Sequence, residues 1–206
     1  MTAMSEPRYP LLTTNRLRMG TDGAGITTLI AGAGCPLHCK WCINAELLER
    51  EPRWVTPQEL YGQVRRDDLY FRATGGGVTF GGGEALLHAE FIRAFREICG
   101  NVWRINAETS LHVPLEQVRI AAECVDEFIV DIKDTDAKIY RDYAGGDVDL
   151  PLKNLEHLLQ AVGSERVFVR VPLIPEFNTT AAQAHTAAKL QAMGVQRIEP
   201  FSYILR

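Results

Sequence analysis

The sequence lacks any apolar run long enough to cross a membrane and has no large excess of charge of either sign. Its longest apolar stretches are interrupted by glycine, threonine or charged residues well before membrane-spanning length. The formal net charge of −4 argues against a general nucleic-acid-binding or membrane-surface protein. There is also no secretory h-region, low-complexity stretch or long-period repeat. We therefore expect a cytoplasmic protein that binds neither nucleic acid nor membrane.

Cysteine is scarce and its arrangement is uneven. The chain has five cysteines among 206 residues, and an odd number without a secretory signal argues against a disulfide framework. Cys99 and Cys124 lie in apolar, periodic segments and are predicted to be buried, inert thiols. Cys35, Cys39 and Cys42 instead lie among glycine, proline, histidine and lysine, which predicts a chemical role for this loop.

The spacing of these three cysteines suits an iron–sulfur cluster. A [4Fe–4S] cluster normally takes four cysteine ligands, so Cys35, Cys39 and Cys42 on one tight loop can hold three of its irons and leave the fourth open. A structural zinc site is the rival interpretation, but it needs four nitrogen or sulfur ligands. The only nearby candidate is His38, which directly precedes Cys39 and is poorly placed to reach the same ion. Since no second cysteine-rich insert follows between Ile43 and Thr56, we expect one cluster.

Apolar runs rich in β-branched residues alternate with helical patterns along the chain. Strands are predicted at Gly25–Ala33, Gly77–Gly81, Val102–Glu108, Glu127–Asp131, Arg166–Ile174 and Gln196–Tyr203. Helices are predicted at Pro57–Arg66, Ala89–Cys99, Pro114–Ala122, Asp136–Tyr143, Leu152–Ala161 and Thr180–Ala192. Thr56 is a natural cap, and Pro57 and Pro114 suit first-turn positions.

This alternation predicts an α/β fold with a parallel sheet and right-handed crossovers. Six β/α units are too few for a closed eight-unit barrel, so we expect an open, partial (β/α)6 TIM-like barrel. The whole chain, 1–206, is expected to form one domain, with a lead-in over 1–21 and the barrel over 22–206.

Polar and glycine-rich motifs follow the predicted strands, where the site of such a fold forms. Gly82, Gly83 and Glu84 follow the second strand without matching a dinucleotide or phosphate-binding spacing, and a plain turn is the alternative. Asp131 and Lys133 face the same side of a strand, either as a solvated pair or as ligand contacts.

Three further residues are candidates near this end of the barrel. Arg170 is a charge in an apolar strand and needs a partner, either a structural acid or a carboxylate or ribose of a ligand. Glu108 ends the third predicted strand. Trp41 directly precedes Cys42 and either packs the loop or shields a cluster and lines an adenine pocket.

The cysteine motif resembles that of the radical S-adenosylmethionine (SAM) superfamily. The run 76–87, Val130-Asp131-Ile132-Lys133 and the run 172–178 follow it in an order similar to the glycyl-radical-enzyme activating enzymes of the pyruvate formate-lyase activase type. This resemblance covers about Asp22 to Pro200 and implies the partial barrel, one [4Fe–4S] cluster and SAM as cofactors.

The resemblance also implies roles for individual residues. Gly82, Gly83 and Glu84 would bind the amino group of SAM, and Lys133 its carboxylate, while Glu108 or Asp131 would contact the ribose or its polar surroundings. Ser202 stands where these enzymes commonly have a SAM-contacting histidine, and Glu108 where they have an aspartate.

The function implied is reductive cleavage of SAM to a 5′-deoxyadenosyl radical, which takes a hydrogen atom from a backbone glycine of a partner glycyl radical enzyme. The chain would then be a monomer reduced by an electron donor such as flavodoxin or ferredoxin, under low-oxygen conditions. Two alternatives remain open: a radical SAM enzyme acting on a small molecule, as a deazaguanine synthase does, and a non-catalytic SAM-binding module.

Overall fold

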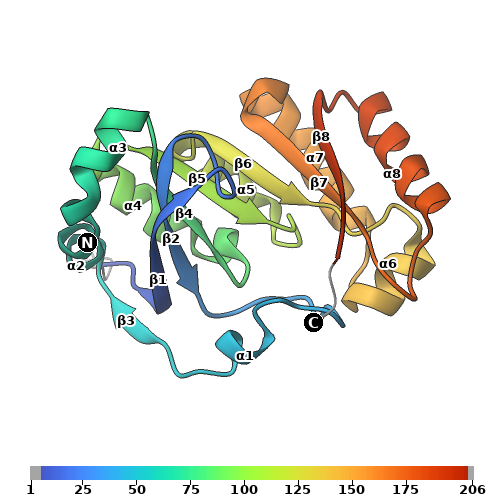
Figure 1. Cartoon of the computed structure of the whole chain (residues 1–206), viewed down its shortest axis with the longest axis horizontal. Coiled ribbons are helices and arrows are strands. Elements are labelled where there is room, and N and C mark those ends of the chain that lie inside the picture. Colours follow the sequence, from blue (N-terminus) through green and yellow to red (C-terminus); the bar gives the residue numbers. More distant parts are fainter. Residues whose placement is uncertain (1–5, 204–206) are drawn as a thin grey trace.

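A single sheet of eight strands forms the centre of the computed structural model, which describes residues 6–203 (Figure 1). The strand order is β3-β1-β2-β4-β5-β6-β7-β8. Six strands, from β2 to β8, run parallel, and β1 and β3 are antiparallel additions at one edge. Because β3 and β8 are the two edges, the described sheet does not close. The predicted open, partial barrel is confirmed.

The strands and helices have the following bounds. The strands are β1 (Tyr9–Met19), β2 (Ile26–Gly32), β3 (Arg53–Val55), β4 (Gly77–Gly82), β5 (Arg104–Thr109), β6 (Glu127–Asp131), β7 (Val167–Leu173) and β8 (Arg197–Ser202). The helices are α1 (Ala45–Leu48), α2 (Pro57–Val64), α3 (Asp68–Thr74), α4 (Ala89–Cys99), α5 (Leu115–Cys124), α6 (Ala137–Ala144), α7 (Asp149–Val162) and α8 (Thr180–Ala192). Short 3-10 turns lie at Arg65–Asp67, Ala85–His88 and Ser164–Arg166.

Several predicted elements are confirmed, the placement of Pro114 is wrong, and strand β1 was not predicted. The bounds of α4, β6 and α8 are as predicted, and Thr56 caps α2 reciprocally with Glu59. The expected lead-in, however, contains strand β1, whose last residues are largely exposed and polar, so it lacks the apolar run that marks a buried strand. Pro114 precedes α5 as its cap rather than lying in its first turn. Residues 1–5 of the lead-in and 204–206 lie outside the described residues.

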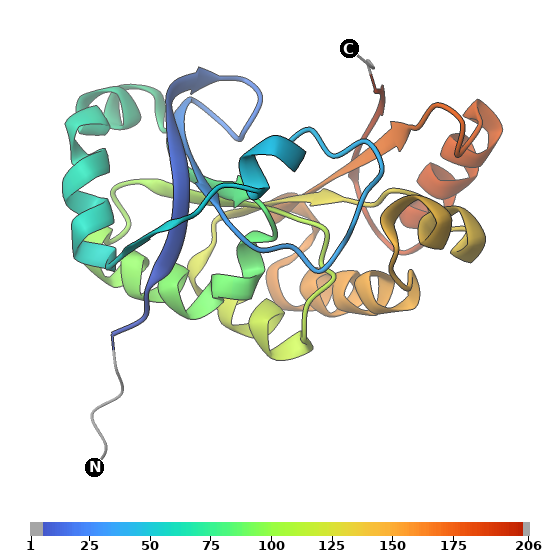
Figure 2. The same ribbon diagram turned by 90° about the horizontal axis from the view of Figure 1, so that it is seen from below.

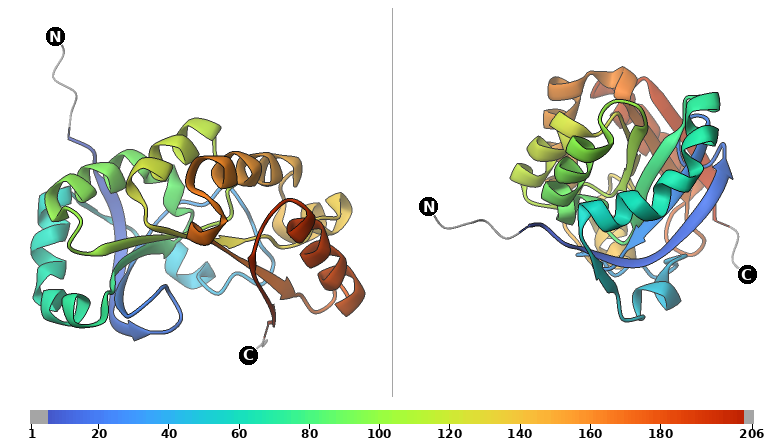
Figure 3. Two further views of the ribbon diagram at one scale, coloured as in Figure 1. Left: turned by 90° about the horizontal axis from the view of Figure 1, so that it is seen from above. Right: turned by 90° about the vertical axis from the view of Figure 1, so that its left-hand side faces the viewer.

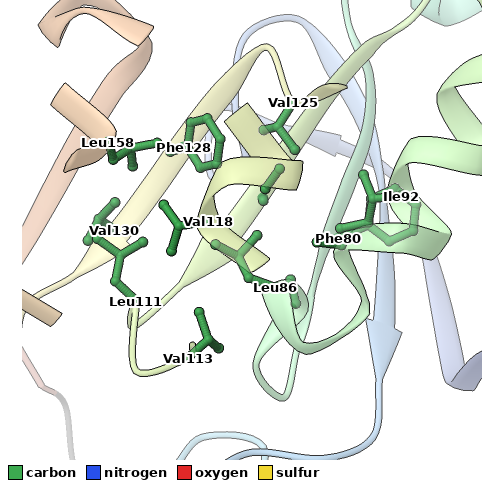
Figure 4. Packing of buried hydrophobic residues seen from close by; sticks show 14 of the residues in the cluster. Phe80, Leu86, Ile92, Leu111, Val113, Val118, Val125, Phe128, Val130 and Leu158 are labelled. Carbon is green, nitrogen blue, oxygen red and sulfur yellow. The ribbon is translucent and has the colours of Figure 1, made fainter. Parts of the chain in front are cut away.

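The core lies between the sheet and the helices on its outer face (Figures 2 and 3). Strand residues alternate in direction, so Phe80, Phe128 and Val130 point toward the helices, where they meet residues such as Ile92 and Leu158 (Figure 4). Val118 and Leu111 lie in the same cluster. The opposite, inner face carries polar side chains, and it is this face that positions the candidate site. Among residues 6–203, no helix is both long and apolar enough to cross a membrane.

Strand β1 is tied to the barrel by a buried carboxylate. Asp67 is fully buried and accepts hydrogen bonds from Arg16 Nε on β1, at 3.0 Å, and from Thr28 Oγ1 on β2, at 2.9 Å. Burial alone would raise the pKa of Asp67, but the hydrogen bonds from Arg16 and Thr28 outweigh it and lower this pKa. The negative charge of Asp67 is therefore stabilised in the folded protein.

Asp67→Asn should lower the free energy of unfolding by about 2 kcal/mol at neutral pH, because it removes the charge that accepts these hydrogen bonds. A carboxylate with a lowered folded pKa contributes stability above the unfolded pKa of about 4, and this contribution is lost as the pH falls. Urea unfolding of both proteins should give a difference that shrinks below about pH 4. Asp142→Asn, in an exposed ion pair with Lys138, is the control and should change stability by about 0.5 kcal/mol or less. A difference that is independent of pH would contradict this account.

Candidate active site

The three clustered cysteines lie on a loop that leaves the carboxyl end of β2 and crosses to α6 (Figure 2). Two backbone hydrogen bonds hold the loop there: His38 N–H donates to Ala144 O at 2.9 Å, and Lys40 N–H donates to Tyr143 O at 3.1 Å. The loop is therefore anchored on the last turn of α6, at the mouth of the barrel.

The five cysteines occupy two kinds of environment, as predicted. Cys99 and Cys124 are buried, and their thiols donate to helix carbonyls. Cys35, Cys39 and Cys42 are free and partly exposed. Burial raises the pKa of Cys35, and raises that of Cys39 to about 11 against the opposing charge of Lys133. Burial therefore keeps the thiols of Cys35 and Cys39 protonated at neutral pH when no cationic group binds them.

The described residues 6–203 contain no group of three or more histidine, cysteine or acidic side chains arranged around a single metal ion. A structural zinc ion requires four such ligands around one point. In an iron–sulfur cluster each cysteine binds a different iron, so the thiols are spread around the cluster. Three partly exposed thiols on one loop fit the second arrangement.

The glycine turn after β4 packs directly against the start of the cysteine loop. A Cβ atom on Gly83 would lie 2.1 Å from Gly34 O, and Gly82 has a φ of +90°. The Asn44 side chain, two residues after Cys42, donates to Gly82 O at 2.8 Å. Glycine is required here by close backbone contact, and the turn and the cysteine loop form one unit.

Glu84 holds this unit to the end of β5. Its buried carboxylate accepts from Thr109 Oγ1 at 2.6 Å, from Ser110 N and Oγ at 2.8 and 2.6 Å, and from Leu86 N at 3.1 Å. A carboxylate has about four acceptor sites, so the charge of Glu84 is fully hydrogen-bonded within the protein. Glu84 thus has a structural role that the sequence did not predict.

Four predicted residues meet in a ladder of charges on the inner face of the barrel. Arg170 on β7 donates from Nε and Nη2 to the two oxygens of Asp131 on β6, at 2.9 and 3.0 Å. Its Nη1 donates to Glu108 on β5, at 3.1 Å. Lys133 Nζ lies 3.4 Å from Asp131 Oδ2 and 3.3 Å from the hydroxyl of Tyr203. Three strands and the loop after β6 thus bring these residues together, as predicted.

Burial and neighbouring charges shift the pKa values of the ladder residues in opposite directions. Burial raises the pKa of Glu108, and Arg170 offsets it only in part. Burial would also raise the pKa of Asp131, but Lys133 and Arg170 outweigh it and hold this pKa below its usual value. Burial would lower the pKa of Lys133, yet the charge of Asp131 raises it. Asp131, Lys133 and Arg170 therefore stay ionised at neutral pH, and Glu108 is the carboxylate most easily protonated.

Trp41 and Ser202 lie at the rim of the mouth. The indole Nε1 of Trp41 donates to Pro175 O at 3.4 Å, and its ring meets the edge of Phe177, with ring centroids 6.5 Å apart. Trp41 therefore connects the cysteine loop with the loop after β7. Ser202 is exposed at the end of β8, and it is the next residue, Tyr203, that reaches Lys133.

Sequence reasoning missed Asn44 and Tyr203 as members of the site. Asn44 lies two residues after Cys42, so its position beside the cysteine motif was an available signal. Tyr203 ends the last predicted strand, where the carboxyl ends of parallel strands meet. The sequence analysis predicted its neighbour Ser202 as the site residue, whereas it is Tyr203 that contacts Lys133. Tyr143 of α6 also borders the site, because its carbonyl accepts from the N–H of Lys40 in the cysteine loop, and nothing in its helical pattern distinguished it from a core residue.

Comparisons with known proteins point to one family for this arrangement. A family model described as the radical SAM superfamily matches residues 29–185. The chain is 31% identical over 190 residues to the pyruvate formate-lyase 2-activating enzyme of Escherichia coli, covering 76% of this chain and 64% of that protein. It is 30% identical over 220 residues to the (2S)-3-sulfopropanediol sulfolyase activating enzyme of Bilophila wadsworthia, covering 77% and 73%. The chain thus spans less than two thirds of the Escherichia coli relative.

Solved structures share the fold at much lower identity. SuiB of Streptococcus suis matches with a TM-score of 0.66 at 15% identity, covering 86% of this chain and 40% of that chain. The same protein bound to S-adenosylmethionine matches with a TM-score of 0.63 at 16% identity, covering 84% and 39%. At this identity the likeness establishes the partial-barrel fold alone.

Glu84→Gln should loosen the junction between the glycine turn and β5, because an amide has one oxygen where four donors now meet a carboxylate. We expect the free energy of unfolding to fall by about 2 kcal/mol and the amide protons of Leu86 and Ser110 to exchange faster. Urea unfolding and hydrogen exchange measure the two effects. Glu90→Gln, in an exposed ion pair with Arg93 on α4, is the matched control and should change neither. Unchanged exchange at Ser110 in Glu84→Gln would contradict the structural role.

Proposed function

The chain belongs to the radical SAM superfamily, and on this basis we propose that it is an activating enzyme for a glycyl radical enzyme. It is an enzyme of the radical SAM type, and its cofactors are a [4Fe–4S] cluster and SAM. The observation that carries the proposal is the identity of about 30% with relatives named as activating enzymes, together with the complete set of three clustered cysteines. Because the chain spans 64% of the first of these relatives, its substrate and partner are part of the proposal.

When bound, the two cofactors supply reductive cleavage of SAM to a 5′-deoxyadenosyl radical, which takes a hydrogen atom from a backbone glycine of the partner. The protein's part is to bind and orient them. Cys35, Cys39 and Cys42 would hold three irons, and their number leaves one iron for SAM. Thiol ligands must lose their protons on binding metal, so binding of the cluster would release protons from these cysteines.

The ladder of charges and the glycine turn would hold SAM. Lys133 would pair with the SAM carboxylate, and the backbone carbonyls of Gly82 and Gly83 would accept from its amino group. Glu84 would act on that amino group through its charge, since its oxygens are already occupied by protein donors. Glu108, Asp131 and Arg170 would present polar groups to the ribose, with Trp41 and Ser202 at the rim.

A glycine of a folded partner must enter the barrel mouth, and the cysteine loop beside that mouth carries exposed apolar side chains. Ile43, directly after Cys42, is 94% exposed, and Trp41, directly before Cys42, is 36% exposed. Such residues favour contact with another protein surface. An electron donor such as flavodoxin or ferredoxin would reduce the cluster.

Cys39→Ala should abolish cluster binding. Anaerobically reconstituted wild type should contain about four irons and four sulfides per chain, and the variant should contain substantially less than one cluster. Iron and sulfide analysis and visible absorption measure the loss. Cys124→Ala, which removes a buried thiol outside the loop, is the matched control and should keep the cluster. A full cluster in Cys39→Ala, or stoichiometric zinc in the wild type, would contradict the assignment.

Activation of a partner is the test of the proposed function. We expect anaerobic incubation of the reconstituted protein, SAM and a strong reductant with its cognate glycyl radical enzyme to give 5′-deoxyadenosine and a doublet electron paramagnetic resonance (EPR) signal with α-hydrogen coupling on the partner. Lys133→Met should lower the rate at least tenfold by weakening SAM binding. Partner in which the target glycine is replaced by alanine is the control and should show no doublet. Turnover of a free small molecule, with no radical on any glycyl radical enzyme, would contradict the activase function and favour the small-molecule alternative.

A further inference from the structure

The side chain of Asn44 makes a hydrogen bond that the local structure around it does not explain. Asn44 directly precedes α1, where an asparagine side chain usually accepts from the first-turn N–H groups of its helix. Asn44 makes no such bond, and its backbone, with φ −102° and ψ 10°, is not the extended backbone of a capping residue. Its Nδ2 instead donates to Gly82 O at 2.8 Å, between residues 38 positions apart. The amide therefore serves a contact with the glycine turn and not its own helix.

The carbonyl that accepts this hydrogen bond lies outside the regular pairing of the sheet. Strand β4 pairs with β5 only as far as Phe80, so Gly82 lies beyond the last pair on that side. On the side of β2 it is the next residue, Gly83, whose N–H donates to Gly32 O. Gly82 is partly exposed. A carbonyl oxygen has two lone pairs, so Asn44 can direct the oxygen of Gly82 and still leave it one acceptor site for a ligand.

This hydrogen bond joins the far end of the cysteine loop to the glycine turn. The start of the loop is joined to the turn by backbone, because the N–H groups of Gly83 and Glu84 donate to carbonyls at the end of β2 and just after it, at 2.9 and 2.8 Å. The middle of the loop bonds instead to α6, through the N–H of Lys40 and the carbonyl of Tyr143. Asn44 then ties the segment after the third cysteine back to the turn.

We propose that Asn44 is a positioning residue for SAM, which holds the carbonyl of Gly82 at a fixed place relative to the cluster. This inference rests on the cluster and the SAM site of the proposed function, in which the cysteines hold the irons and Gly82 accepts from the amino group of SAM. Asn44 lies on the loop of the cysteines and bonds to Gly82, so it connects the two holders directly. A ligand that must engage two holders at once binds more tightly when their spacing is fixed in advance.

The test compares SAM affinity in anaerobically reconstituted wild type, Asn44→Ala, Asn44→Asp and the control Asn101→Asp. Both Asn44 variants lack the N–H donor, while aspartate keeps the size of the side chain and suits the start of α1. The dissociation constant of SAM, measured by anaerobic equilibrium dialysis with the oxidised cluster, should rise about tenfold in both. Asn101 is exposed in the turn after α4, and its variant should bind SAM as wild type does. Wild-type affinity in either Asn44 variant would overturn the inference.

Two readouts separate this positioning role from a general loss of structure. The iron and sulfide content of both Asn44 variants should equal that of wild type, because no cysteine is changed. The KM for SAM should rise about tenfold in 5′-deoxyadenosine formation, while kcat at saturating SAM stays within about twofold of wild type. A variant that loses its cluster, or one that loses kcat with an unchanged KM, would overturn the inference.

The connection itself can be tested in protein without cofactors. In Asn44→Ala the amide protons of residues 82–84, and those of Ala45 and Leu48 beside the substituted residue, should exchange faster than in wild type. Asn101→Asp should leave their exchange unchanged. Hydrogen exchange at residues 82–84 that is equal in Asn44→Ala and wild type would show that Asn44 does not restrain the turn, and would overturn the inference.

Failure of the proposed function and failure of this inference give different results. Wild type that binds no cluster after reconstitution, or a cluster but no SAM, would overturn the proposed function and, with it, the role of Asn44. Wild type that binds both, together with Asn44 variants of unchanged SAM affinity, would overturn only the role of Asn44.

Discussion

The arrangement of side chains at the barrel mouth depends on one partly buried ion pair, in which Arg170 donates hydrogen bonds to both carboxylate oxygens of Asp131. The two residues are direct neighbours in the register of β6 and β7, and the third nitrogen of the same guanidinium reaches Glu108 on β5. Charges removed from water are tolerated only when they are paired in good geometry, so this contact fixes three strands relative to one another. Lys133 joins through Asp131, and its ammonium is therefore positioned before any ligand arrives.

The other side of the mouth is held by close contact of backbone rather than by charge. Gly83 approaches Gly34 more closely than any side chain permits, and Asn44 bonds to the same turn from beyond the third cysteine. Glu84 accepts hydrogen bonds from Thr109 and Ser110 and so holds this turn against the carboxyl end of β5. The cysteine loop is thus restrained by β4 on one side and by α6 on the other, so three thiols on a loop can keep a fixed relation to the strand ends.

The parallel core was predictable because its signals are local. Helix α4 and strand β6 have the predicted bounds, since apolar period and length define a buried element from a few residues. Strand β1 was not predictable in this way, because its second half is largely exposed and polar and its position is set by pairing with β2. The site residues at strand ends could be predicted from topology alone. The saturation of Glu84 could not, because three of its four hydrogen bonds come from Thr109 and Ser110, 25 and 26 residues further along the chain.

The charged side chains of the ladder are paired with one another before any cofactor binds. Glu108 and Asp131 face Lys133 and Arg170, and Glu108 is the one member of the ladder whose pKa is shifted toward its neutral form. An oxidised [4Fe–4S] core with three thiolates has one net negative charge, while SAM, with its sulfonium, ammonium and carboxylate, has one net positive charge. Net charge is costly in a poorly hydrated site. In the proposed function the negative cluster and the positive SAM would offset each other in net charge, while Lys133 and Glu84 would act on the carboxylate and the amino group of SAM.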